Sequence, residues 1–469
     1  MRVFTLIAGV AFARVAIAEL GVSPAKVVID SPESTVQVLV SDDSGDRTRA
    51  ARYKTANPKV AVVSKIGRIL PVGDGKTEIV IRDGAKSIKV PVEVKSYQQP
   101  VPISFEHQVV PIFSKAGCNS GGCHGKAEGQ NGFKLSIFGF DAAFDFDALV
   151  KEGRGRRVVV SSPDDSLLLR KAAALVPHGG GAKIEKNGQW YRRIQRWISE
   201  GALLDNSPVL PAARIEVEPL DVILAPNKSQ QLRVVAIDAD GNRRCVTAES
   251  EFQSNATQIA DVDHEGLIEV TGVPGEAAIL VRYMGQVAVS RITLPQTNVA
   301  FKRPTENNFI DKHVWDKLKK LGIQPSEAAN DATFMRRAYL DTIGTLPTAT
   351  EARKFLSDTG ADKRTRLIDE LLKRDEYAVY WGMRWADILR VDRLQVTSQG
   401  AVAMTRWLRR QFEQNTPYDQ FARQIVTASG DAQAESPAGF YKALKKPDAM
   451  GRSISQLLLG VRIECAQCH

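Results

Sequence analysis

The chain has 469 residues, of which 43% are hydrophobic and 25% are charged. These fractions are average for globular proteins, so they exclude wholesale disorder and a protein with many membrane spans, and the length allows roughly three or four domains. Lys and Arg outnumber Asp and Glu by 63 to 54, which gives a net charge of +9. Because this surplus is modest and its basic clusters are short and far apart, we expect no nucleic-acid partner.

The first 18 residues have the pattern of a signal peptide. Arg2 supplies a positive charge, Val3–Ala13 an apolar run, and Ala16-Ile17-Ala18 the small-x-small site that a signal peptidase needs. The run is too short to cross ~30 Å of hydrocarbon as a helix, and no later stretch is long enough for a span. We therefore predict an exported protein, periplasmic or at the cell surface, without a transmembrane span; the alternative is a buried N-terminal strand.

Two segments, residues 19–97 and 211–297, are predicted to be all-β. Short β-branched runs such as Val36–Val40 and Gln231–Ile237 are separated by turn signals rich in Gly and Asp. The segments are also copies of each other, since Asn57, Gly67 and Gly75 recur as Asn255, Gly266 and Gly275. This pattern resembles the bacterial Ig-like group 2 domain, which implies a β-sandwich acting as a spacer, a binding arm or a purely structural module.

The rest of the sequence is predicted to be mostly helical. Residues 98–210, between the two copies, are dense in glycine and then show helical periodicity at Ser166–Leu175 and Gln189–Glu200. Residues 298–469 carry apolar residues at i, i+3 and i+4 in Phe309–Leu321, Lys363–Leu372, Tyr377–Leu389 and Ala403–Phe412. The predicted fold is therefore multidomain, with two all-β sandwiches flanking a small mostly α domain and an α-helical C-terminal domain after them.

The sharpest local signal is Cys118-Asn119-Ser120-Gly121-Gly122-Cys123-His124. Covalent haem attachment uses two thiols and a histidine directly after the second, usually as C-x-x-C-H, with the histidine as iron ligand. Here four residues separate the cysteines, and the two glycines could bulge so that both sulfurs still meet a flat macrocycle. A disulfide between Cys118 and Cys123, or a zinc site, is the alternative.

A regular C-x-x-C-H, Cys465-Ala466-Gln467-Cys468-His469, ends the printed sequence. It predicts a second haem, attached to Cys465 and Cys468 with His469 as iron ligand. No residues follow to wrap that haem, so a surrounding fold would have to come from upstream, and a truncated reading frame is one explanation.

A haem iron that transfers electrons needs a second axial ligand. His178 lies in a Pro-containing loop before the helix predicted at Gln189–Glu200, and residues 104–204 contain no methionine. His178 is therefore the preferred distal ligand and His107 the second candidate. The alternative is that His178 caps a helix or faces solvent.

At this point a family resemblance extends over most of residues 100–469. Val110–Cys118 and Gly125–Asp141 look like the cytochrome-c-like segment of large exported planctomycete-type proteins. Four further stretches resemble the domain of unknown function 1549, here truncated at its C-terminus. They are Leu321–Ile323, Asp331–Pro347, Trp385–Arg390 and Leu459–His469. The resemblance implies haem binding at Cys118, Cys123 and His124 and again at Cys465, Cys468 and His469, in an exported electron-transfer protein whose redox partner is unknown.

No catalytic motif stands out, because the chain lacks a G-x-S-x-G elbow, a P-loop, a G-x-G-x-x-G and an H-E-x-x-H. We therefore predict an exported c-type haem-binding protein with haem c as cofactor, acting in electron transfer. The alternative is a cell-surface binding or structural protein that contacts the surface or a polysaccharide through its Ig-like domains, with disulfide or vestigial Cys/His sites. A weaker third reading is an oxidoreductase or polysaccharide-active enzyme.

Overall fold

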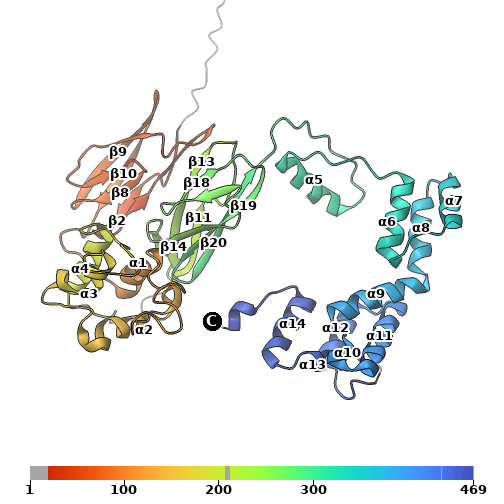
Figure 1. Cartoon of the computed structure of the whole chain (residues 1–469). Coiled ribbons are helices and arrows are strands. Elements are labelled where there is room, and N and C mark those ends of the chain that lie inside the picture. Colours follow the sequence, from red (N-terminus) through yellow and green to blue (C-terminus); the bar gives the residue numbers. More distant parts are fainter. Residues whose placement is uncertain (1–19, 206–211, 435, 468–469) are drawn as a thin grey trace, which may run out of the picture. The chain divides into compact units, whose positions relative to one another are not determined.

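The computed structural model describes residues 20–205, 212–434 and 436–467. The chain divides into two compact units, residues 1–325 and residues 326–469. In the first unit, a first β-domain (residues 20–97) and a second β-domain (residues 212–297) flank a central domain (residues 98–205), and the second unit is helical (Figure 1). The predicted fold class is thus confirmed. Among the described residues no helix is long and apolar enough to cross a membrane.

The first β-domain consists of short antiparallel strands plus one parallel pair. Its sheets have the strand orders β1-β4-β5, β2-β10-β9-β6 and β3-β8-β7, and β2 runs parallel to β10. Alternate residues of the long hairpin β9–β10, such as Ile79, Ile81 and Val90, are fully buried, as the period of a strand requires. The strands are β1 Gly21–Ser23, β2 Val27–Ile29, β3 Val36–Gln37, β4 Leu39–Asp42, β5 Gly45–Asp46, β6 Arg52–Thr55, β7 Ala61–Val63, β8 Arg68–Pro71, β9 Gly75–Asp83 and β10 Lys86–Val94.

The second β-domain repeats this topology. Its sheets have the orders β11-β14-β15, β12-β20-β19-β16 and β13-β18-β17, and β12 runs parallel to β20. The strands are β11 Ala212–Glu218, β12 Asp221–Ile223, β13 Ser229–Gln231, β14 Arg233–Asp238, β15 Arg243–Cys245, β16 Glu251–Ser254, β17 Ala260–Val262, β18 Leu267–Val270, β19 Gly275–Tyr283 and β20 Gln286–Leu294.

The two β-domains also share their buried side-chain hydrogen bonds. Gln37 donates through Nε2 to the carbonyl oxygens of Val38 and Ile66, and Gln231 donates through Nε2 to those of Leu232 and Glu265. Buried amides need such partners, so each glutamine pins a strand to a turn. Two threonine hydroxyls form a second matching pair, because Thr48 Oγ1 accepts from the Val40 amide and Thr247 Oγ1 from the Val234 amide.

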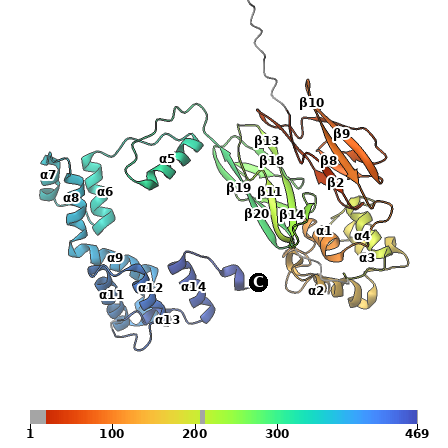
Figure 2. The same ribbon diagram turned by 180° about the vertical axis from the view of Figure 1, so that it is seen from behind.

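The central domain is built from short helices around an aromatic core. Phe105, Phe146 and Trp197 meet with ring centroids 5.1–6.5 Å apart, in tilted and edge-on arrangements. Seen from behind, this domain lies below both β-domains, which lie side by side (Figure 2). Its helices are η1 Phe105–Val109, α1 Val110–Lys115, η2 Ile137–Gly139, α2 Ala142–Phe146, η3 Asp147–Lys151, η4 Glu152–Gly155, η5 Pro163–Asp165, α3 Leu167–Ala172 and α4 Gln189–Ser199.

Helices make up the rest of the described chain. Helix α5 (Phe309–Leu321) belongs to the first unit, where the Gln296 amide donates to the Leu321 carbonyl oxygen. The second unit packs around two apolar clusters, one centred on Tyr339 and Leu371 and the other on Leu408 and Phe421. Its helices are α6 Asp331–Ile343, α7 Ala349–Ser357, α8 Lys363–Leu372, α9 Asp375–Ile388, α10 Arg393–Val396, α11 Ser398–Glu413, α12 Tyr418–Val426, α13 Gly439–Ala443, α14 Pro447–Leu459 and η6 Glu464–Gln467.

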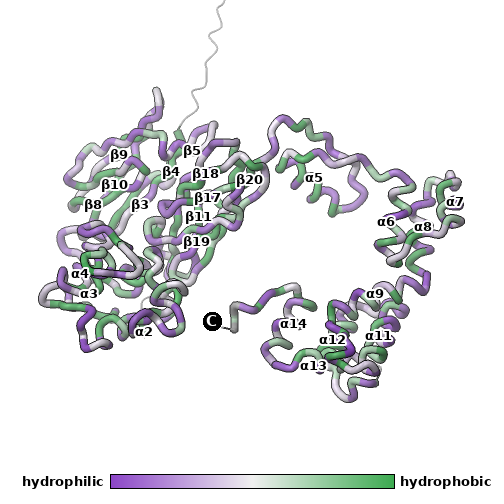
Figure 3. Tube along the Cα trace, in the orientation of Figure 1, coloured by the Kyte–Doolittle hydropathy of each residue, from purple (hydrophilic) through white to green (hydrophobic). Residues whose placement is uncertain are grey.

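Most of the predicted elements are present, with small changes at their ends. The helices predicted at Phe309–Leu321 and Lys363–Leu372 have the observed bounds, whereas the strand predicted at Val36–Val40 is divided at Val38 into β3 and β4. Apolar and polar residues alternate along the strands and helices of each unit (Figure 3). That alternation is the pattern that the sequence prediction used.

Candidate functional site

The Cys118–His124 segment forms a compact loop directly after α1. The Cys118 amide donates to the Phe113 carbonyl oxygen at the end of α1, and the His124 amide donates back to the Cys118 carbonyl oxygen at 3.0 Å. The loop then closes so tightly that a Cβ on Gly125 would collide with the carbonyl oxygen of Asn119. Glycine is therefore required after His124, and the loop presents both thiols and the imidazole to one side.

Two histidines face each other across this site. His124 Nδ1 lies 3.0 Å from the Phe133 carbonyl oxygen, and His178 Nδ1 lies 2.8 Å from the Gly181 carbonyl oxygen. Because a carbonyl oxygen only accepts, each Nδ1 carries a proton and donates it to that oxygen. The two rings are nearly parallel, at 7°, with centroids 6.3 Å apart. Burial lowers the pKa of His124, so its neutral form is favoured.

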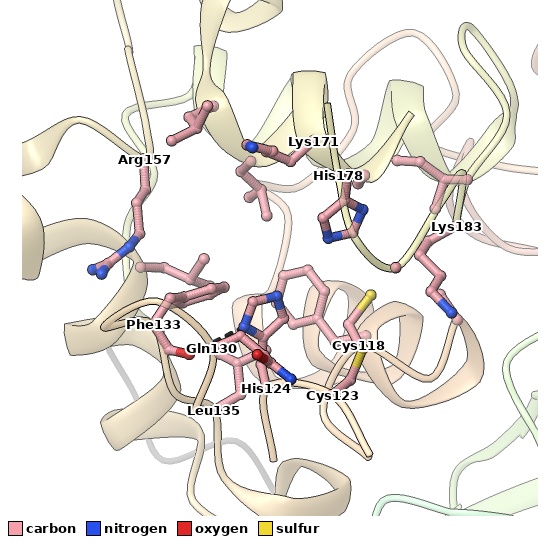
Figure 4. Close-up of a pocket in the computed structure, with 18 of the residues that line it drawn as sticks. Cys118, Cys123, His124, Gln130, Phe133, Leu135, Arg157, Lys171, His178 and Lys183 are labelled. Carbon is pink, nitrogen blue, oxygen red and sulfur yellow. Dashed lines mark hydrogen bonds between the residues drawn. The ribbon is translucent and has the colours of Figure 1, made fainter. Parts of the chain in front are cut away.

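The thiols and imidazoles line a cavity of about 650 Å³ in the central domain (Figure 4). Its apolar wall comes from α1, α4 and the segments between them, and includes Phe113, Leu149 and Ile194. Four cationic side chains also line it, and no Asp or Glu is found among its lining residues, all of which lie in the described chain. The cations are Arg156, Arg157, Lys171 and Lys183. An apolar wall with several cations suits a ligand that has an apolar body and anionic groups.

The cations differ in how firmly they are held. Arg157 is buried, donates to the carbonyl oxygens of Ala148 and Gly132, and lies 4.7 Å from the centroid of the Phe133 ring. Lys171 donates to the carbonyl oxygen of Pro177, next to His178. These contacts fix the loops on which Phe133 and His178 stand.

Both cysteines of the loop are free thiols in this structure, as is Cys245. Burial raises the pKa of Cys118 to about 11, so its thiol is protonated at neutral pH. A protonated thiol is a poor nucleophile, and Cys118 therefore has no sign of an activated catalytic cysteine.

The structure places the residues that the sequence singled out in three different regions. Cys118, Cys123, His124 and His178 line one cavity. The second candidate for a distal ligand, His107, does not line it and lies in η1, where its carbonyl oxygen accepts from the Tyr283 hydroxyl of the second β-domain. Of the C-terminal motif, Cys465 lies in η6, and Cys468 and His469 lie outside the described residues.

Sequence reasoning missed the cationic lining of the cavity. Arg156 and Arg157 form one of the short basic clusters of the sequence, and nothing in that cluster indicates that Arg157 is only 6% exposed. The one signal available was that basic residues flank both the Cys118 loop and the His178 loop in an otherwise glycine-rich segment.

The prediction of an exported haem protein that transfers electrons is wrong on these observations. That function needs a metal centre, and throughout residues 20–205, 212–434 and 436–467 no group of three or more His, Cys, Asp or Glu side chains could hold a metal ion. Cys118, Cys123, His124 and His178 are the residues of the cavity that could contact a cofactor, and haem c there stays a prediction that none of these observations tests. The alternative, a cell-surface binding or structural protein, is the better supported of the two functions.

Comparisons with known proteins cover different parts of the chain. Residues 309–469 match the family model "PSCyt2: Protein of unknown function (DUF1549)", which confirms that part of the resemblance. No curated protein matches the chain.

Similar solved structures include fragments of an S-layer protein. Domains 5-6 of S-layer protein SbsC are 14% identical, with a TM-score of 0.24, and the alignment covers 60% of this chain and 99% of that one. Domains 4-9 of surface layer protein SbsC are 13% identical, with a TM-score of 0.24, over 61% of this chain and 32% of that one.

Proposed function

We propose that this chain is an exported cell-surface binding or structural protein. The observation that carries the proposal is that the two β-domains and the central domain interlock into one block. Arg193 of α4, which is 3% exposed, donates to the Glu33 carbonyl oxygen of the first β-domain and to the Glu249 carboxylate of the second. A surface protein needs such a block to hold a binding site at a fixed distance and orientation.

The β-domains also contact each other through matching positions. Gln37 and Gln231 are equivalent, as are Asp46 and Cys245, which lie two residues before Thr48 and Thr247 respectively. The Gln231 amide donates to Asp46 Oδ2 at 2.7 Å, and the Gln37 amide lies 3.4 Å from Cys245 Sγ. Reciprocal contacts of this kind are typical of a two-fold interface, which closes on itself and leaves neither copy of the patch free.

A contact between two equivalent residues supports the same arrangement, because such a contact lies on the pseudo-two-fold axis that relates the two β-domains. Ser23 and Glu218 are equivalent, because each directly precedes a proline near the start of its own β-domain, and Ser23 Oγ donates to Glu218 Oε2 at 3.0 Å. Arg233 donates to both of these side chains. The β-domain pair is therefore a rigid element, and surfaces other than this interface would make the contacts with a cell surface or a polysaccharide.

Export of the chain rests on the signal-peptide pattern of residues 1–18. Surface labelling of intact cells with a membrane-impermeant amine reagent tests it, with a cytoplasmic enzyme as control. We expect the chain to be labelled and to lack residues 1–18. A chain that is labelled only after lysis and keeps its N-terminus would overturn the proposed location.

Binding is tested by sedimenting the purified chain with isolated cell envelopes, before and after polysaccharide is removed from them. We expect the chain to pellet with untreated envelopes. Failure to pellet with any envelope fraction would exclude a surface function. An absorption spectrum of the same material is a second check, because a covalently bound haem that cycles with a redox partner would restore the electron-transfer function.

A further inference from the structure

Helix α1 connects the cavity to the second β-domain. On one side, Ile112, Phe113 and Ala116 line the cavity. On the other side, Lys115 donates to the carbonyl oxygens of Ser250 and His264, and its Nζ lies 4.7 Å from the centroid of the Phe252 ring. A change in the position of the second β-domain is therefore transmitted to a wall of the cavity.

Helix α4 connects the cavity to both β-domains in the same way. Ile194 lines the cavity, while the neighbouring Arg193 contacts both β-domains. Arg196, one turn further along, donates through Nη1 to Glu33 Oε1 at 2.5 Å, and Gln189 Nε2 lies 3.4 Å from the Glu33 carbonyl oxygen. Three side chains of α4 thus hold the Glu33 loop of the first β-domain.

Both wall helices are short, although each also packs into the core of the central domain, where Ile112 and Trp197 are buried. Helix α1 has six residues and α4 has eleven, lengths at which an isolated helix is marginal in water. The side chains that line the cavity lack packing partners on the side of the cavity. Contacts with the β-domains therefore add to the core packing that fixes the two helices.

We propose that the β-domains act as a two-sided clamp that sets the opening of the central cavity. Loss of the α4 contacts with Glu33 and Glu249 lets α4 and α1 separate and opens the cavity, and a ligand in the cavity strengthens the association of the three domains by the same factor. The proposal rests on the packing of the first unit and does not depend on the proposed surface function.

Hydrogen exchange of the full-length chain, resolved by peptide, tests this clamp. The variant Arg193→Ala removes the contacts with both β-domains, and Arg192→Ala is the matched control, because Arg192 is exposed on the same helix and its guanidinium donates to the nearby Asn187 carbonyl oxygen. The readout is the peptide covering residues 118–135, which touches neither arginine in any of these contacts. We expect its exchange to rise on the order of tenfold in Arg193→Ala and to stay unchanged in the control.

Alkylation of Cys245 reports separately on the domain interface, since its sulfur lies against the Gln37 amide. Faster alkylation of Cys245 with unchanged exchange at residues 118–135 would overturn the clamp, because the domains would then separate without opening the cavity. If Arg193→Ala fails to fold, Arg196→Ala provides the same test, since it removes the partly exposed contact with Glu33 together with those to Glu200 and the Val101 carbonyl oxygen and leaves Arg193 in place. Unchanged exchange in a folded Arg196→Ala protein with a loosened interface would also overturn it.

Discussion

Asp145, which is fully buried on α2, should make the stability of the central domain depend on pH. Its carboxylate accepts from the Ser136 amide at 2.5 Å and from the Ser136 hydroxyl at 2.8 Å. Burial outweighs these hydrogen bonds and raises its pKa from 3.8 to about 6. Ser136 follows Leu135, a lining residue of the cavity, so the pair fixes one end of the cavity wall.

The sign and size of the effect follow from linkage. Between pH 3.8 and about 6 the folded state binds a proton that the unfolded state has released, so the free energy of unfolding falls as the pH rises. A shift of about two pKa units corresponds to about 3 kcal/mol. That stabilisation is fully present at pH values below the pKa of Asp145 in the unfolded state, and it is lost at pH values above its pKa in the folded state.

The variant Asp145→Asn isolates this contribution, because it keeps the shape of the side chain but cannot ionise. We expect the free energy of unfolding of the natural protein, minus that of the variant, to fall by about 3 kcal/mol between about pH 3.5 and about pH 6.5. Urea unfolding followed by hydrogen exchange in peptides from residues 136–150 measures it within the central domain. A constant difference across that range would refute the reasoning.

Three further substitutions test other parts of the structure. Gly125→Ala should destabilise the central domain by several kcal/mol, because its Cβ meets the Asn119 carbonyl oxygen, whereas Gly122→Ala, which has open space, should melt like the natural protein. Asp46→Ala should lower the free energy of unfolding of the first unit by about 1–3 kcal/mol, because it leaves the Gln231 amide without its acceptor; equal urea midpoints would contradict this. Gly344→Ala should destabilise the second unit alone, because Gly344 ends α6 with φ +70° and its Cβ would meet the Tyr380 ring. Calorimetry measures the effect, and Gly451→Ala, where a Cβ has open space, is the control.

Local patterns were sufficient to predict most of the helices and the duplicated β-domains. The helix at Lys363–Leu372 shows its apolar period in ten residues, and its bounds are those of α8. Gly67 and Gly266 recur because both adopt a left-handed φ, +75° and +78°, in equivalent turns. Where a residue's conformation is decided by its near neighbours in sequence, the sequence alone was informative.

Contacts between distant segments could not be predicted in the same way. Lys115 has the sequence context of an exposed helix end, yet it reaches carbonyl oxygens of Ser250 and His264, more than 130 residues away. The four cations of the cavity come from three segments that only the tertiary fold brings together, the adjacent Arg156 and Arg157 after η4, Lys171 on α3 and Lys183 in the loop after α3. The spacing of Cys118, Cys123 and His124 indicated the right loop, but not the function, because the same donors suit several ligands.

The central domain also shows why its neighbours matter to the site. Much of its backbone lies in turns and short π or 3₁₀ segments, and its α-helices have five to eleven residues. A cavity of about 650 Å³ removes packing that a domain of this size would otherwise use for stability. The buried Arg193 of α4 and Lys115 of α1 make additional contacts with the β-domains, and both helices line the cavity. The duplicated β-domains therefore support the cavity from outside, through α1 and α4, although the residues that line it all belong to the central domain.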